Sequence, residues 1–119
     1  PKIKIFNTYY KINNLKNFDL KKRYLIFSGI GNPDNFKETL IDNRINIIKS
    51  LEYPDHYQYK TKDIKKIKDD AKKLNAKIIT TEKDYMRLNR SNSKDIQFLK
   101  IELKIKEKKK FINFLKNKI

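Results

Sequence analysis

Tyr24-Leu25-Ile26-Phe27 is a short apolar run without a polar break, and a pair of glycines and a helix signal follow it. A run of this length fits a strand that is buried on both faces, as strands are in parallel sheets. Asn32 can cap the helix that comes next, and Pro33 suits its first turn, where a missing N–H is tolerated. This segment therefore predicts a buried strand followed directly by a helix.

Strand and helix patterns continue to alternate along the chain. They are a strand at 45–51, a helix at 62–74 behind an N-cap at Thr61, a strand at 77–80 and a short helical turn capped by Thr81 and Asp84. Alternation of this kind implies an α/β fold with a mostly parallel sheet and helices on both faces. We therefore expect a Rossmann-like α/β/α sandwich.

The two ends of the chain carry weaker patterns. Residues 2–12 are rich in strand formers and predict one or two linker strands, or a hairpin. Residues 99–105 alternate apolar and polar side chains, which predicts one half-exposed strand. Residues 106–119 predict a helix with a strongly basic outer face.

The charge of the chain has two explanations. Thirty basic residues outnumber 14 acidic ones in a chain of 119, which gives a formal charge of +16. Only four of the basic residues are arginines, on which dedicated nucleic-acid sites rely for bidentate contacts. Lys, Ile and Asn all have AT-rich codons, so genomic base composition accounts for a Lys-rich surface without a polyanion partner. A functional surface for anionic membranes or other polyanions remains the alternative.

Several classes of site and segment are excluded by composition. The chain has no cysteine, so it can form neither disulfides nor thiolate metal sites, and its single histidine cannot build a zinc site. No apolar run approaches the about 20 residues of a membrane-spanning helix. The Gly-Lys-Ser/Thr of a phosphate-binding P-loop is absent, so the chain alone is not expected to transfer phosphate from ATP by that mechanism.

Three polar loops follow the predicted strands. The only histidine, His56, comes after Asp55 in one of them, and His is the usual proton carrier of an active site. Gly29-Ile30-Gly31-Asn32 and Thr81-Glu82-Lys83-Asp84 follow the other two strands. Because ligands gather at the carboxyl ends of parallel strands, we expect the three loops to build a single site.

Each loop also has a plainer interpretation. The two glycines precede a helix N-terminus, which suits an anion such as phosphate, but they also suit a purely structural turn. His56 is either a proton carrier or a surface histidine. Glu82, Lys83 and Asp84 either contact a polar substrate or form an ordinary charged helix start.

A small basic nucleic-acid-binding domain or a metal-dependent nuclease is the competing class. Pro54-Asp55 and Glu102-Leu103-Lys104 match a loose PD…ExK pattern, although an E-x-K match arises easily in a chain with so many lysines. The residues by themselves leave this alternative open.

The three loops together resemble a known family. Phe27-Ser28-Gly29-Ile30-Gly31-Asn32-Pro33, Tyr53-Pro54-Asp55-His56 with Tyr59, and Ile79-Thr80-Thr81-Glu82-Lys83-Asp84 with Arg87-Leu88 are similar to the carboxy-terminal domain of the tetraacyldisaccharide 4'-kinases. These are the lipid A 4'-kinases of Gram-negative bacteria. The resemblance is specific over about residues 20–90, because three motifs occur in the right order.

The resemblance implies a phosphotransferase that moves the γ-phosphoryl of ATP to the 4'-hydroxyl of a lipid A disaccharide precursor. ATP and Mg²⁺ would be bound mainly by an amino-terminal P-loop domain, to which residues 1–19 would be the linker and residues 20–119 the carboxy-terminal domain. The chain begins with Pro1 rather than Met, which we take as a hint of a longer protein.

The resemblance also implies the roles of single residues and the location of the enzyme. His56 would work with an aspartate of the other domain to activate the acceptor hydroxyl, and Asp55 would orient His56 or the substrate. Gly29, Gly31, Asn32, Thr81, Glu82, Lys83 and Asp84 would lie near the substrate or nucleotide, with no metal ligand among them. The expected location is the cytoplasmic face of the inner membrane, peripherally bound, with no nucleic-acid partner.

Overall fold

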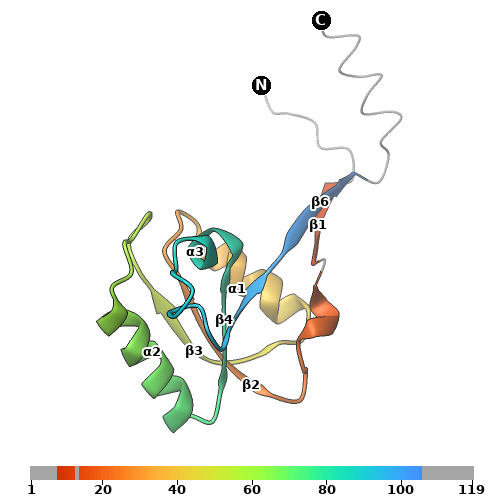
Figure 1. Cartoon of the computed structure of the whole chain (residues 1–119). Coiled ribbons are helices and arrows are strands. Elements are labelled where there is room, and N and C mark those ends of the chain that lie inside the picture. The colour runs from red at the N-terminus through yellow and green to blue at the C-terminus, as the bar shows by residue number, and fades with distance from the viewer. Residues whose placement is uncertain (1–7, 13, 106–119) are drawn as a thin grey trace, which may run out of the picture.

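A four-stranded sheet forms the centre of the computed structural model, which describes residues 8–12 and 14–105 (Figure 1). Its strands are β2 (Arg23–Ser28), β3 (Asn46–Glu52), β4 (Lys77–Thr81) and β5 (Ile96–Leu99), in the spatial order β3-β2-β4-β5. Every neighbouring pair is parallel. The helices are α1 (Pro33–Asp42), α2 (Thr61–Lys73) and the short α3 (Glu82–Met86). The predicted α/β class and parallel sheet are confirmed.

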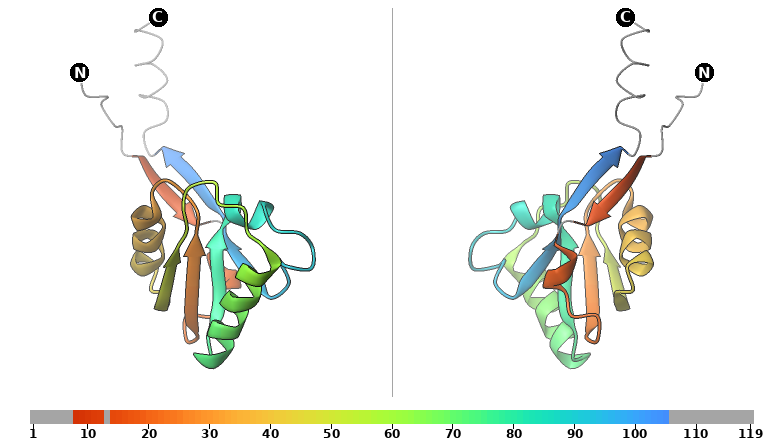
Figure 2. Two further views of the ribbon diagram at one scale, coloured as in Figure 1. Left: turned by 90° about the vertical axis from the view of Figure 1, so that its left-hand side faces the viewer. Right: turned by 90° about the vertical axis from the view of Figure 1, so that its right-hand side faces the viewer.

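Alternate side chains of β2 enter two separate hydrophobic clusters. Tyr24 and Ile26 pack with Phe36 and Leu40 of α1. Leu25 and Phe27 belong to the second cluster, with Ile64, Ile67 and Ala71 of α2. Because successive side chains of a strand point to opposite faces, α1 and α2 cover opposite faces of the sheet, as Figure 2 shows. The continuous apolar run of β2 is thus explained by burial on both faces.

The prediction of one strand over residues 99–105 is wrong. The segment divides into β5, which joins the parallel sheet, and β6 (Ile101–Ile105), which pairs antiparallel with β1 (Thr8–Ile12) in a separate two-stranded sheet. Asn14 marks the break: its side-chain NH₂ donates to the carbonyl of Phe98 at 2.7 Å, and its oxygen accepts from the N–H of Lys100 at 2.9 Å. These bonds end the ladder of β5 and turn the chain toward β1.

The predicted helix starts are confirmed at two sites and wrong at one. The side chains of Asn32 and Thr81 accept the backbone N–H of Asn35 and Asp84, at 3.2 and 3.0 Å. Thr61, in contrast, is the first residue of α2, and Lys60 holds the N-cap position. The carboxylate of Asp63 accepts the Lys60 N–H at 2.9 Å and thereby fixes this start.

The remaining elements complete the described part of the chain. A 3₁₀ turn, η1 (Leu15–Asn17), connects the two-stranded sheet to the segment before β2. The helix predicted for 106–119 lies outside the described residues, as do residues 1–7 of the predicted linker. Among the helices that are described, none has the length and apolar character needed to cross a bilayer.

Candidate functional site

The loops after β2, β3 and β4 all lie at the carboxyl ends of the parallel strands. The chain runs from β2 to β3 on one side and then crosses to β4 on the other, so the connections after β2 and β4 lead to opposite faces. Such a switch in strand order opens a crevice at the carboxyl ends of the strands, where α/β proteins bind their ligands. The three loops singled out in the sequence therefore meet where a site is expected.

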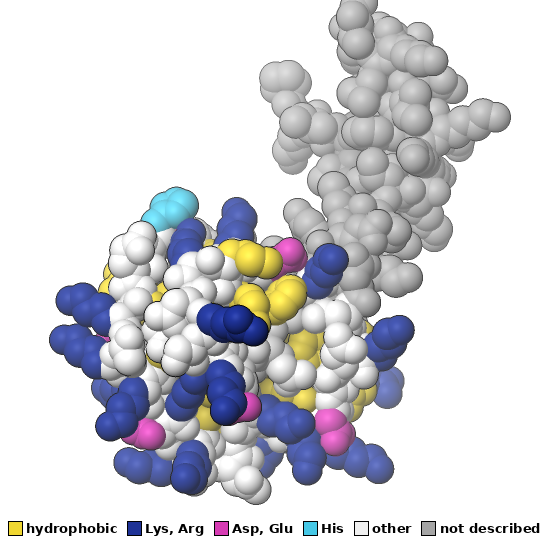
Figure 3. All heavy atoms as spheres, viewed as in Figure 1, with side chains coloured by type: hydrophobic (Ala, Val, Ile, Leu, Met, Phe, Trp, Pro, Cys, Tyr) yellow, Lys and Arg dark blue, Asp and Glu magenta, His cyan; other side chains and the backbone are white. Residues whose placement is uncertain are grey.

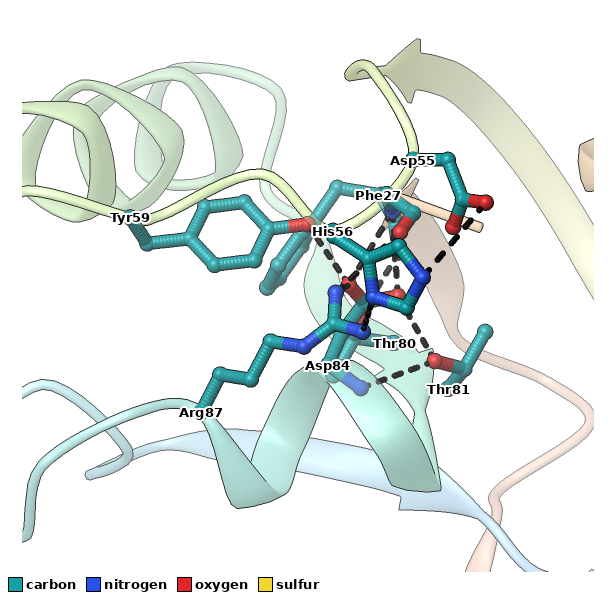
Figure 4. Close-up of polar contacts among 9 residues, drawn as sticks. Phe27, Asp55, His56, Tyr59, Thr80, Thr81, Asp84 and Arg87 are labelled. Carbon is teal, nitrogen blue, oxygen red and sulfur yellow. Dashed lines mark hydrogen bonds and ion pairs between the residues drawn. The ribbon is translucent and has the colours of Figure 1, made fainter. Parts of the chain in front are cut away.

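Asp84 joins the three loops. Its side chain is 0% exposed, and its carboxylate accepts hydrogen bonds from the N–H of Gly29 at 3.1 and 3.0 Å and from the hydroxyl of Tyr59 at 3.0 Å (Figure 4). The hydroxyl of Thr81, in the loop after β4, donates to the same carboxylate at 2.6 Å. A buried carboxylate needs such compensation, because an unpaired charge away from water is strongly unfavourable. Asp84 thus holds the loops together from beneath rather than facing solvent.

Tyr59 is held by the same network and by other aromatic rings. Its ring packs edge-on against Phe27, Tyr53 and Tyr57, with ring centroids 5.2–5.3 Å apart. Burial and the neighbouring Asp84 carboxylate raise the pKa of Tyr59 above its usual range. The phenol therefore stays protonated and keeps its O–H as a donor to Asp84. This packing fixes the end of the loop that carries His56.

The two glycines differ in how closely they are surrounded. Neither has a positive φ, so close approach rather than backbone geometry explains Gly29. A Cβ at Gly29 would lie 3.0 Å from the Pro54 carbonyl oxygen, 3.0 Å from the Tyr59 hydroxyl and 3.2 Å from Asp84. At Gly31 the nearest atom would be a carboxylate oxygen of Asp55 at an ordinary 3.5 Å.

Gly29→Ala is expected to lower the free energy of unfolding by about 1–3 kcal/mol, the typical effect of forcing an atom into a packed site. Gly31→Ala, the matched control, is expected to stay within about 0.5 kcal/mol of wild type. Urea unfolding of both variants measures the difference. Equal stability of the two variants would contradict the proposed close approach at Gly29.

His56 lies in the loop after β3, close to the hydrogen bonds that surround Asp84. Its backbone has a φ of 62°, in the left-handed region, and its N–H donates to the Gly29 carbonyl at 3.1 Å. The imidazole is 79% exposed, with Nδ1 3.0 Å from Nη2 of Arg87 and Nε2 3.8 Å from the Asp55 carboxylate. Asp55 is therefore near the ring without being hydrogen-bonded to it. Figure 4 shows the ring between the Arg87 and Asp55 side chains.

Arg87 is a site residue that the sequence motifs included without giving it a role. Its side chain is 21% exposed, and its guanidinium donates from Nη1 to the Gly29 carbonyl at 3.2 Å and to Asp84 at 3.5 Å. The signal in the sequence was that it is one of four arginines among 30 basic residues. A planar guanidinium holds five N–H donors in a fixed fork, whereas a lysine ammonium is a compact charge with three rotatable donors.

A cleft of about 890 Å³ opens between the loop after β2 and α3, and Arg87 is among its lining residues. Its apolar lining includes Ile30, Phe36, Met86 and Leu99, and its polar lining includes Gly31, Asn32, Thr81, Glu82, Lys83 and Arg87. A volume of this order suits a small organic ligand. Gly31, Asn32, Thr81, Glu82 and Lys83 thus line one cleft, whereas Asp84 is buried below it and His56 and Asp55 do not line it.

The distribution of acidic and basic groups limits the chemistry of the site. Within residues 8–12 and 14–105, no three His, Cys, Asp or Glu side chains are grouped so that they could hold a metal ion. Asp55 follows β3 of the parallel sheet, whereas Glu102 belongs to β6 of the other sheet, so the PD…ExK halves are not on neighbouring strands. Figure 3 shows Lys and Arg side chains spread over the visible face, with His56 at its upper edge.

Comparison with known proteins gives the family. A model of the tetraacyldisaccharide-1-P 4'-kinases matches residues 5–119. The chain is 48% identical over 115 residues to the tetraacyldisaccharide 4'-kinase of Pelagibacter ubique, covering 97% of this chain and 37% of that protein. It is 46% identical over 89 residues to the Rickettsia typhi enzyme, covering 75% of this chain and 27% of that protein.

The chain spans about a third of the length of these curated relatives. No solved structure gives a significant match. The family model covers nearly the whole chain and the identities are high, and the three loops that follow the parallel strands lie within the matched stretch. This chain belongs to the tetraacyldisaccharide 4'-kinase family.

Proposed function

We propose that this chain forms part of a kinase that transfers the γ-phosphoryl of ATP to the 4'-hydroxyl of a tetraacyldisaccharide 1-phosphate. Family membership supports the reaction class. The observation that carries the role of this chain is the exposed His56 at the carboxyl ends of the strands, where its imidazole contacts Arg87 and its backbone N–H donates to the Gly29 carbonyl. An exposed ring on a rigid base is suited to meet a substrate or a second domain.

We place the phosphate-binding P-loop on another domain of the same protein. The chain contains no Gly-x-x-x-x-Gly-Lys-Ser/Thr, and relatives are about three times as long as the stretch that matches. Residues 1–19 would link that domain to this one, and the site would lie between the two domains. His56 and Asp55 are then contributed by this side, and the cleft lined by Asn32 and Lys83 faces the substrate or nucleotide.

Mg²⁺ accompanies ATP in phosphoryl transfer, where it neutralises developing charge. The described residues of this chain do not fit a Mg²⁺ site: Asp84 is fully engaged in internal hydrogen bonds, and no three His, Cys, Asp or Glu side chains are grouped so that they could hold a metal ion. We therefore assign Mg²⁺ mainly to the amino-terminal domain. The work of this chain is positioning and hydrogen bonding.

We also propose a peripheral position at the cytoplasmic face of the inner membrane. An acylated disaccharide is a membrane lipid, so its kinase must work at the bilayer surface. The formal charge of +16 would draw the protein to anionic headgroups by long-range attraction.

The proposal is tested by incubating the complete protein that carries this chain with γ-labelled ATP and tetraacyldisaccharide 1-phosphate. Label is expected on the acceptor, and an acceptor that already bears a 4'-phosphate serves as the control and should stay unlabelled. The 119-residue chain alone is expected to transfer no label. Transfer by the chain alone would contradict a divided site, and Mg²⁺-dependent cleavage of duplex DNA without phosphoryl transfer would favour a nuclease.

A further inference from the structure

Arg87 contacts three groups at once, and one of them is the His56 ring. Nη1 donates to the Gly29 carbonyl and to Asp84, while Nη2 lies 3.0 Å from Nδ1 of His56. The Gly29 carbonyl also accepts the backbone N–H of His56. Backbone and side chain of His56 are therefore both tied to the Gly29–Arg87 pair, which the buried Asp84 anchors from below.

The chemistry of guanidinium decides which nitrogen of His56 carries the proton. Every polar hydrogen of Arg is a donor and the group has no acceptor, so Nδ1 must accept through its lone pair. A neutral imidazole that accepts at Nδ1 carries its hydrogen on Nε2. An imidazolium, with N–H on both nitrogens, would place an N–H against an N–H at this contact. The Arg87 contact is compatible only with the neutral Nε2–H form.

The free nitrogen then points toward solvent beside Asp55. Nε2 is 3.8 Å from the Asp55 carboxylate, too far for a hydrogen bond, and the ring is 79% exposed. Its N–H is thus available to an acceptor from outside the described residues, such as a carboxylate, a phosphate or a hydroxyl oxygen. In this form the exposed nitrogen is a hydrogen-bond donor rather than a base.

We propose that Arg87 is a positioning residue that fixes His56 as the Nε2–H tautomer, so that His56 meets its target as a donor. The functional part of this inference rests on the proposed kinase activity, whereas the tautomer itself does not. A donor at this place would orient a carboxylate or phosphate oxygen at the reacting centre instead of removing the proton of the acceptor hydroxyl.

The tautomer is measured by ¹⁵N NMR of the 119-residue chain, in which His56 is the only histidine and needs no assignment. Spectra are recorded at rising pH until the two nitrogen signals no longer change, and the tautomer is assigned from those spectra. We expect one nitrogen signal at the unprotonated position, Nδ1, and the other at the protonated position, Nε2. A protonated Nδ1, or two signals already averaged in the wild type, would overturn the proposal.

Variants test whether Arg87 is the group that fixes the tautomer of His56. In Arg87→Ala the two nitrogen signals are expected to move toward each other, as tautomers begin to exchange, while Arg90→Ala removes an exposed arginine nearby and should leave them in place. Arg87→Lys keeps a positive charge beside Asp84 without the planar fork, so the signals should shift while the fold is retained. Unchanged signals in folded Arg87→Ala and Arg87→Lys would overturn the proposal.

Kinetics of the complete kinase test the functional consequence. Arg87→Ala is expected to lower kcat by about 10- to 100-fold with little change in KM, the loss typical of a misplaced catalytic group. If Arg87 acts through His56, the double variant with His56→Ala is no slower than His56→Ala alone. An additive loss would contradict this coupling. If the wild-type enzyme transfers no phosphoryl group, the proposed kinase activity is refuted. The NMR measurement would still test the tautomer of His56 independently.

Discussion

Asp84→Ala is expected to lower the free energy of unfolding by about 3–5 kcal/mol, the range found when one partner of a buried ionic network is removed. The substitution leaves the Gly29 N–H, the Tyr59 hydroxyl and the Arg87 guanidinium without their common acceptor. Because a domain is stable by only about 5–15 kcal/mol, this is a large part of the total. Urea unfolding of the 119-residue chain measures the loss.

Two further variants make this prediction decisive. Asp69→Ala removes an exposed aspartate of α2 and should change stability by less than about 0.5 kcal/mol. Asp84→Asn keeps the shape but loses the charge and one acceptor oxygen, so an intermediate loss is expected if Asp84→Ala does not fold. Asp84 variants as stable as Asp69→Ala would show that the carboxylate does not hold the three loops together.

His56→Ala in the complete kinase is expected to lower kcat by about 100- to 1000-fold, the effect of removing a single well-placed hydrogen-bond donor at a reacting centre. The fold should be retained, because the ring is 79% exposed and packs against no core residue. Initial rates at saturating ATP measure the change in kcat. Gln58→Ala, an exposed residue of the same loop, is the matched control and should keep wild-type activity.

Local signals in the sequence were sufficient for most of the fold. The run of β2, the cap at Asn32 and the cap at Thr81 act over a few residues, so their patterns predict the elements directly. The division between β5 and β6 could not be predicted in this way. It depends on the side chain of Asn14, which lies 84 residues from its partner Phe98 in the sequence and is close to it only in the folded chain.

The site shows the same distinction. The sequence predicts a local capping pair of Thr81 and Asp84, and the cap is present. The principal partners of the Asp84 carboxylate, however, include Gly29 and Tyr59, which are 55 and 25 residues away. Arg87 likewise contacts His56 across 31 residues. The positions of the motifs after the strands predict which loops meet. The contacts that hold these loops, and the side chains that face solvent, are visible only in the folded chain.

The rate of His56→Gln beside that of His56→Ala tests most directly whether His56 serves as a donor in a divided kinase site. Glutamine offers an N–H near the position of Nε2 but has no basic nitrogen. We predict that in the complete kinase His56→Gln keeps kcat within about tenfold of wild type, while His56→Ala loses about 100- to 1000-fold. Equal and severe losses in both variants would make His56 a base, and wild-type turnover by His56→Ala would remove it from the site.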